Sequence, residues 1–351
     1  MPLNASGEAE GSFVPVRFAH KLFARGRQVW GKLHPWVTLG GRVPPRRMIW
    51  AVLMTAVALA IGYQVVKNWQ EISQYPWRLD YIQFLKASLA FSVSLMISVL
   101  CWSLILRQLG SSNSFGTNAR LYCTTNLARR LPTPIWFLGS RMMAYKEMGV
   151  RKGTTLSAMM LEGIVTAFGG LVVAIFSLPF GPYAQVVQQS VGVFPFLIPI
   201  IIFVIRPAWL FAIVNVVLRR VKIQTLEVKL RPLDMLIWSG LFATNWTLGG
   251  LLLYYLVNVV YPISASLAPA MINIWSVAGV VTLLGHLTML LPAGFGVKQL
   301  IAAYLLSFYI PWPAAVLVAI LSRLSVTLLE VFWMLVWQFL DRAWWKRRAK
   351  A

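Results

Sequence analysis

Acidic residues are scarce in this chain, with ten Asp and Glu in 351 residues against 32 Lys and Arg. Most of the acids lie apart, and no paired Asp motif marks a loop. The two cysteines, Cys101 and Cys123, have no metal-ligand spacing, and we expect no disulfide between them on a cytoplasmic side. A Walker loop, a dinucleotide Gly pattern, HExxH and a Ser nucleophile elbow are all missing. We therefore expect no cofactor and no metal site.

Long polar stretches are also few, because hydrophobic residues make up 58% of the chain and charged residues 12%. The mean hydropathy of +0.69 is too high for a soluble globule. The net charge of +22 would suit a nucleic acid, but a basic DNA-binding stripe needs a soluble fold, and none is visible. The composition predicts an integral membrane protein with no nucleic-acid partner.

The positive charges are concentrated. Of the 32 Lys and Arg, 27 lie in four segments, namely 1–47, 107–152, 206–231 and 342–350. The positive-inside rule assigns such segments to the cytoplasm, which predicts a multi-pass protein of the cytoplasmic (inner) membrane with both termini inside. Residues 1–47 form a basic tail in which 18–30 is either an interfacial helix or disordered chain. Residues 342–351 form a second basic tail.

Apolar length predicts six crossings within the transmembrane domain 48–341. They are Met48–Val66, Ile82–Leu106, Thr154–Phe180, about Gln188–Ile205, Leu233–Val260 and Pro313–Leu340. Two apolar regions remain. Region 112–148 holds several cations and favours a broken hairpin, whereas the first limb of 268–309 is long enough to span, with 298–310 returning as a half-helix. Charge alone leaves six or eight crossings open.

Each of these two regions contains a Pro/Gly break, LPTPIWFLGSR at 131–141 and LPAGFGVKQ at 291–299. The breaking residues are Pro132, Pro134, Pro292, Gly294 and Gly296. A charge inside an apolar stretch follows each break after about thirty residues. We therefore predict an all-α polytopic membrane bundle of six to eight crossings, with two re-entrant broken helices. Segments 82–180 and 233–341 would form an inverted repeat, the architecture in which transporters bind substrate near the midplane.

The charges that follow the breaks are Glu162 and Arg323, and Glu330 lies seven residues after Arg323. Ionisable groups in a membrane face a partner or a polar cavity. One interpretation is a gate or coupling site. The other is a closed Glu162–Arg323 ion pair that only holds the repeats together.

Four cations near the breaks are candidate ligands for an anionic headgroup: Arg129, Arg130, Arg141 and Lys298. For Arg129 and Arg130 the simpler interpretation is positive-inside anchoring. His286 either relays protons or bonds a neighbouring helix, and the same choice between cavity lining and interhelical bonding applies to Asn126, Asn245 and Asn273.

The segments NLARRLPTPIWFLGSR, MMLEGIV, LPAGFGVKQLIAAYLL and ILSRLSVTLLE resemble the lysylphosphatidylglycerol synthase transmembrane-region family of flippase-like bacterial proteins. The resemblance covers about residues 48–341. It implies movement of lipids such as aminoacylated phosphatidylglycerol, hopanoids or polyprenyl-linked lipids. The chain departs from the family's Gly-Val-Arg-Glu at Lys298–Gln299, which keeps the cation and loses the acid, and from its Leu-Pro-Gly at Thr133.

The resemblance implies translocation of an anionic phospholipid or isoprenoid-type lipid between leaflets of the bacterial membrane, without enzymatic synthesis. The implied partners are membrane lipids and a separate lipid-modifying enzyme; a homo-oligomer is left open. Two alternatives remain: a membrane-embedded glycosyl or lipid transferase for envelope lipids, and a non-catalytic scaffold or assembly subunit.

Overall fold

The computed structural model describes residues 80–130, 134–184, 198–206, 208–209, 212, 215–216, 230–287 and 297–348. All of them belong to one compact unit, and every regular element in these ranges is helical. The predicted 1–47 tail and the Met48–Val66 span lie outside the described residues. Of the predicted Gln188–Ile205 span, the structure describes the helix α9, Ile198–Ile205.

Within the described residues, five segments are long and apolar enough to cross a membrane: Tyr81–Gln108, Lys152–Phe180, Pro232–Val260, Ala265–Leu283 and Trp312–Leu340. They correspond to α4 (Tyr81–Gln108), α7 (Lys152–Ser177), α11 (Pro232–Val260), α12 (Ala268–Leu287) and α14 (Trp312–Arg348). Four of them match predicted spans, and α12 is the limb for which the sequence left open whether it crosses. The described part of the chain is therefore all-helical and consistent with a helical membrane bundle, and α14 continues from its apolar part into the basic segment 342–348.

Polar residues define where two of the long helices begin. The Asp80 carboxylate accepts hydrogen bonds from the backbone N–H groups of Ile82 and Gln83, which have no partner within α4. At the start of α11, Pro232 occupies the first turn and the Asp234 carboxylate accepts the Arg231 N–H. Gln108 at the end of α4 also donates to Asp234, at 3.2 Å. These contacts tie the end of α4 to the start of α11.

A short helix follows each predicted break. Before the first break come α5 (Phe115–Asn126) and the 3-10 helix η2 (Leu127–Arg130), and α6 (Pro134–Glu147) follows it. After the second break comes α13 (Val297–Leu306), a helix of ten residues. Region 112–148 is thus a pair of short helices, and region 268–309 is a long limb followed by a short one.

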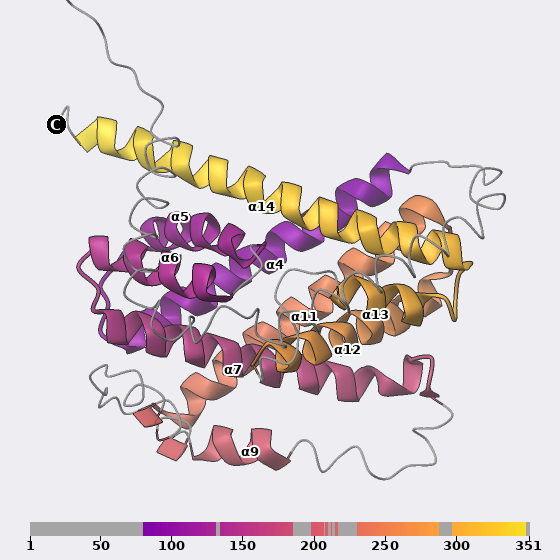
Figure 1. Cartoon of the computed structure of the whole chain (residues 1–351), viewed down its shortest axis with the longest axis horizontal. Coiled ribbons are helices and arrows are strands. Elements are labelled where there is room, and N and C mark those ends of the chain that lie inside the picture. Colours follow the sequence, from indigo (N-terminus) through magenta and orange to yellow (C-terminus); the bar gives the residue numbers. More distant parts are fainter. Residues whose placement is uncertain are drawn as a thin grey trace, which may run out of the picture. The chain divides into compact units, whose positions relative to one another are not determined.

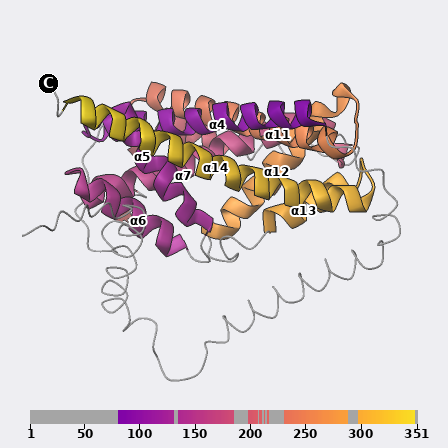
Figure 2. The ribbon, with the colours of Figure 1, turned by 90° about the horizontal axis from the view of Figure 1, so that it is seen from above.

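Helix α11 is the centre of the packing, because it contacts α4, α7, α12 and α14. Figure 2 shows α4 and α11 side by side. The short helices α5 and α13 pack on opposite halves of the long α14 (Figure 1). The buried apolar residues divide accordingly into one cluster around Trp102 and Leu161 and another around Leu253 and Ala315. Each short-helix region therefore has its own core.

Glycines allow close packing around two tryptophans between α7, α11 and α12. A methyl group at Gly279 of α12 would overlap the Trp246 indole, and one at Gly249 of α11 would overlap Trp275. Small residues at such positions let membrane helices approach closely. The glycines thereby make room for two large rings inside the bundle.

We predict that Gly279→Ala lowers the free energy of unfolding by about 1–3 kcal/mol, because the added methyl forces the Trp246 ring to move. The matched control is Gly240→Ala on α11, where an added methyl meets nothing within 4 Å. This control should leave stability unchanged or raise it by up to about 1 kcal/mol. Thermal unfolding of the detergent-solubilised protein measures both. Equal effects of the two substitutions would contradict the packing at Gly279.

Candidate functional site: a buried carboxylate and two arginines

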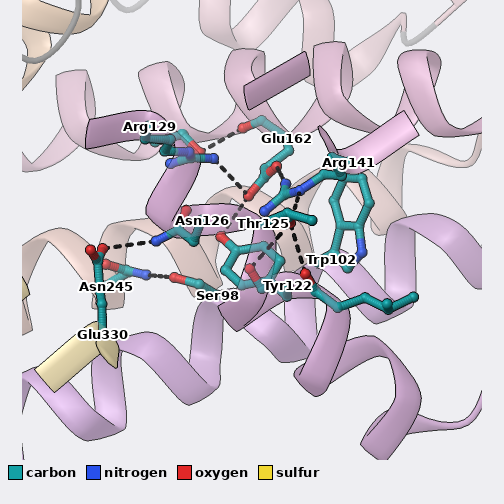
Figure 3. A network of polar contacts seen from close by, with 12 residues as sticks. Ser98, Trp102, Tyr122, Thr125, Asn126, Arg129, Arg141, Glu162, Asn245 and Glu330 are labelled. Carbon is teal, nitrogen blue, oxygen red and sulfur yellow. Dashed lines mark hydrogen bonds and ion pairs between the residues drawn. The ribbon is translucent and has the colours of Figure 1, made fainter. Parts of the chain in front are cut away.

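Glu162 lies in the middle of α7, where its side chain is 4% exposed. Its Oε2 accepts a hydrogen bond from Arg141 Nη1 on α6 at 2.6 Å. Its Oε1 accepts one from the Tyr122 hydroxyl on α5, also at 2.6 Å. Figure 3 shows the carboxylate surrounded by these donors. Both oxygens are satisfied, as a carboxylate away from water requires.

Arg141 is completely buried, so it is not open to a headgroup in this conformation. Its guanidinium carbon lies 4.4 Å from the ring centroid of Trp102, 4.3 Å from Tyr122 and 4.6 Å from Phe137. Its Nε also donates to the Thr125 hydroxyl at 3.2 Å. A planar guanidinium suits this combination of ring stacking and directional hydrogen bonds. Arg141 is thus a fixed internal partner of Glu162.

A second row of hydrogen bonds holds the aromatic rings in place. The Trp102 indole N–H donates to the Tyr145 hydroxyl at 2.6 Å, and that hydroxyl donates to Asn118 Oδ1 at 3.3 Å. Asn118 Nδ2 in turn donates to Ser103 of α4 at 3.2 Å. Burial also raises the pKa of the Tyr122 phenol, whose helix α5 is not one of the five candidate spans. The phenol therefore stays protonated and remains a donor to Glu162.

Arg129 of η2 is the accessible member of the group. Its side chain is 45% exposed, and its guanidinium carbon lies 4.3 Å from the Phe137 ring centroid. Within the described residues its guanidinium makes one hydrogen bond, from Nη2 to Glu162 Oε1 at 3.5 Å. That distance is at the limit for a hydrogen bond, and 45% of the side chain is open to a ligand. We call Tyr122, Arg129, Arg141 and Glu162 the Glu162 cluster.

The other two predicted charges lie on α14. Glu330 is buried and accepts a hydrogen bond from Asn126 Nδ2 at 2.8 Å, which links α14 to α5. One interpretation of the sequence made Arg323 the counterion of Glu162, but the Glu162 carboxylate forms its ion pairs with Arg141 and Arg129. Arg323 and Glu330 remain on one helix, two turns apart. The suggested ion pair between the two halves of the sequence is therefore replaced by ion pairs within segment 82–180.

Lys298, the second residue of α13, contacts two tryptophans from neighbouring helices. Its Nζ lies 3.2 Å from the Trp275 ring centroid and 5.3 Å from that of Trp246. Both distances fall within the range of cation–π attraction. We call these three residues the Lys298 cage.

Several predicted site residues cannot be placed in this way. The breaking residues Pro132, Pro292, Gly294 and Gly296 lie outside the described residues, whereas Pro134 is the first residue of α6. The side chains of Arg130 and His286 also lie outside them. The roles predicted for these residues, Pro134 apart, stay predictions.

The sequence left open whether the asparagines line a cavity or bond neighbouring helices, and in the structure they make hydrogen bonds between helices. Asn245 of α11 accepts from Ser94 of α4 at 2.8 Å and donates to the Ser98 hydroxyl. Asn273 of α12 donates to Ser177 of α7 at 3.2 Å. Lipid offers the amide groups no hydrogen-bonding partner, and each amide instead bonds a neighbouring helix.

No protein-family model and no curated protein matches this chain. The resemblance to the flippase-like family therefore stays a prediction. Among the described residues, no group of three His, Cys, Asp or Glu side chains is placed to hold a metal ion. The candidate site is thus defined by its own geometry.

The sequence did not identify the aromatic partners of the two cations. The contact with Phe137 could have been predicted, because Phe137 lies one helical turn before Arg141, on which it stacks. Trp102 and Tyr122 come from other helices, and so do Trp246 and Trp275 for Lys298. No local pattern in a single sequence reports such long-range contacts.

We predict that Glu162→Gln lowers the free energy of unfolding by about 3 kcal/mol, because it leaves the buried Arg141 cation without a counterion. Glu147→Gln serves as the control, since Glu147 is an exposed carboxylate at the end of α6 and should change stability by less than about 0.5 kcal/mol. Thermal or denaturant unfolding in detergent measures both. A Glu162→Gln protein as stable as the native chain would contradict the central role of the pair.

Proposed function

We propose that this protein translocates a lipid with an anionic headgroup between membrane leaflets, and that Arg129 receives the headgroup at the α5–α6 pair. The observation that carries the proposal is the contrast between the two arginines that share Glu162. Arg141 is fully buried and stacked on three rings, whereas Arg129 is 45% exposed and, among the described residues, contacts one ring and pairs with Glu162 at 3.5 Å. The first cation holds the carboxylate, and the second is available to a ligand.

The exposed guanidinium favours an anionic ligand. Glu162 pairs directly with both arginines, and the nearby Glu330 carboxylate also acts on Arg129. A phosphate that contacts the exposed face of Arg129 forms charge-assisted hydrogen bonds with it. A phospholipid or an isoprenoid phosphate supplies this group together with a hydrophobic tail.

The arrangement of the helices supports transport. Helices of spanning length contact α11, and each half of the sequence also contains short helices, namely α5 and α6 in the first and α13 in the second. Transporters with inverted repeats use such interrupted helices to bind polar substrates within the membrane. On this proposal the segments 82–180 and 233–341 are inverted repeats, both breaks are re-entrant, and both termini are cytoplasmic.

We predict that Arg129→Gln slows transport of fluorescent phosphatidylglycerol across liposomes about tenfold, because the headgroup loses a charge-assisted contact. Stability should change by less than about 1 kcal/mol, since the lost ion pair is long and exposed. A dithionite-quenching assay measures the leaflet exchange, with phosphatidylcholine and a polyprenyl phosphate as comparison lipids.

The matched control is Arg151→Gln, which removes an exposed arginine at the start of α7 that makes no capping bond. This variant should transport at the native rate. Failure of the native protein to move any of the three lipids would contradict translocation, and copurification with a large complex would then favour a scaffold. Formation of a new lipid product from a lipid-linked sugar would instead favour a transferase.

A further inference from the structure

The Lys298 cage is constructed from three helices. Trp275 comes from α12, Trp246 from α11 and Lys298 from the first turn of α13. Gly249 and Gly279 leave the space that the two indoles fill. The ammonium group is therefore held in a defined place beside the start of α13, where first-turn backbone N–H groups have no helical partner.

A short path of hydrogen bonds joins this cage to the Glu162 cluster. The Trp246 indole N–H donates to the backbone carbonyl of Thr166 at 2.8 Å. The Thr166 hydroxyl donates to the backbone carbonyl of Glu162 at 2.6 Å. Glu162 and Thr166 are one turn apart on α7, so a shift of the Trp246 ring acts on the turn that carries Glu162.

We propose that Lys298 is a second cationic station for the same phosphate-bearing headgroup, and that Trp246 couples its occupancy to the Glu162 cluster through Thr166. This inference rests on the proposed translocation function. A phosphate adds full charge and hydrogen-bond acceptors to the contacts that the Lys298 ammonium group makes with the two rings. An arriving headgroup therefore changes the position of Lys298 and of the Trp246 ring beside it.

The coupling can be tested without lipid transport. The full chain, labelled with 5-fluorotryptophan in phosphatidylcholine nanodiscs, gives fluorine NMR signals for Trp102, which stacks on Arg141 of the Glu162 cluster, and for Trp275 in the Lys298 cage. Single Trp→Phe spectra assign the signals among the 16 tryptophans. Lys298→Gln should shift both signals, whereas Lys152→Gln, which removes an exposed cation on α7, should shift neither.

Trp246→Phe is the decisive variant, because it keeps an aromatic face for Lys298 and loses the donor to Thr166. In this background Lys298→Gln should still shift Trp275 and no longer shift Trp102. If Trp102 fails to respond in the native background, or still responds in Trp246→Phe, the coupling is overturned.

The ligand is tested by adding phosphatidylglycerol to the nanodiscs or inorganic phosphate to the buffer. Phosphatidylglycerol should shift the Trp275 signal in the native chain and not in Lys298→Gln, and phosphate should leave it unchanged. An equal shift with phosphate would overturn a lipid source for the anion. An unchanged Trp275 signal in protein that transports phosphatidylglycerol would overturn the second station alone, whereas absent transport overturns the proposed function itself.

Discussion

A carboxylate in the middle of an apolar helix must find its partners inside the protein, because hydrocarbon solvates neither charge nor hydrogen-bonding groups. Glu162 meets this constraint with donors from α5, η2 and α6. The need for these donors fixes the short helices against α7, and the aromatic residues around Arg141 complete the same core. The position of Arg129 at the edge of the group follows from this arrangement.

In both halves of the chain a cation packs against aromatic rings. In each half a short helix after the break carries a cation onto aromatic rings from neighbouring helices: Arg141 on Trp102 and Tyr122, and Lys298 on Trp246 and Trp275. The first half adds a buried carboxylate, and the residue after Lys298 is Gln299. On the proposed mechanism the two stations differ accordingly, with a carboxylate-paired arginine cluster at one and a lysine against two tryptophans at the other.

Helix positions were largely predictable from the sequence, because apolar length and the Pro/Gly interruptions are local signals. The spans around α4, α7, α11 and α14 follow from such runs, and α12 was recognised as long enough to cross. The importance of Glu162 followed from its isolation in an apolar helix. Its counterion did not, because Arg141 and Arg323 were both available and only the packing of α6 against α7 selects Arg141. The cages around the cations depend on contacts between distant helices, which a single sequence does not encode in any local pattern.

The central claim is that Arg129, held beside a closed Glu162–Arg141 pair, binds an anionic lipid headgroup. The most direct measurement is mass spectrometry of the lipids that copurify with the full chain in detergent-free polymer nanodiscs, compared with the bulk membrane and with the Arg129→Gln protein. We expect phosphate-bearing anionic lipid to be enriched around the native chain and to fall to the bulk proportion in Arg129→Gln. Lipid of bulk composition around the native chain, or equal enrichment around both proteins, would contradict the claim.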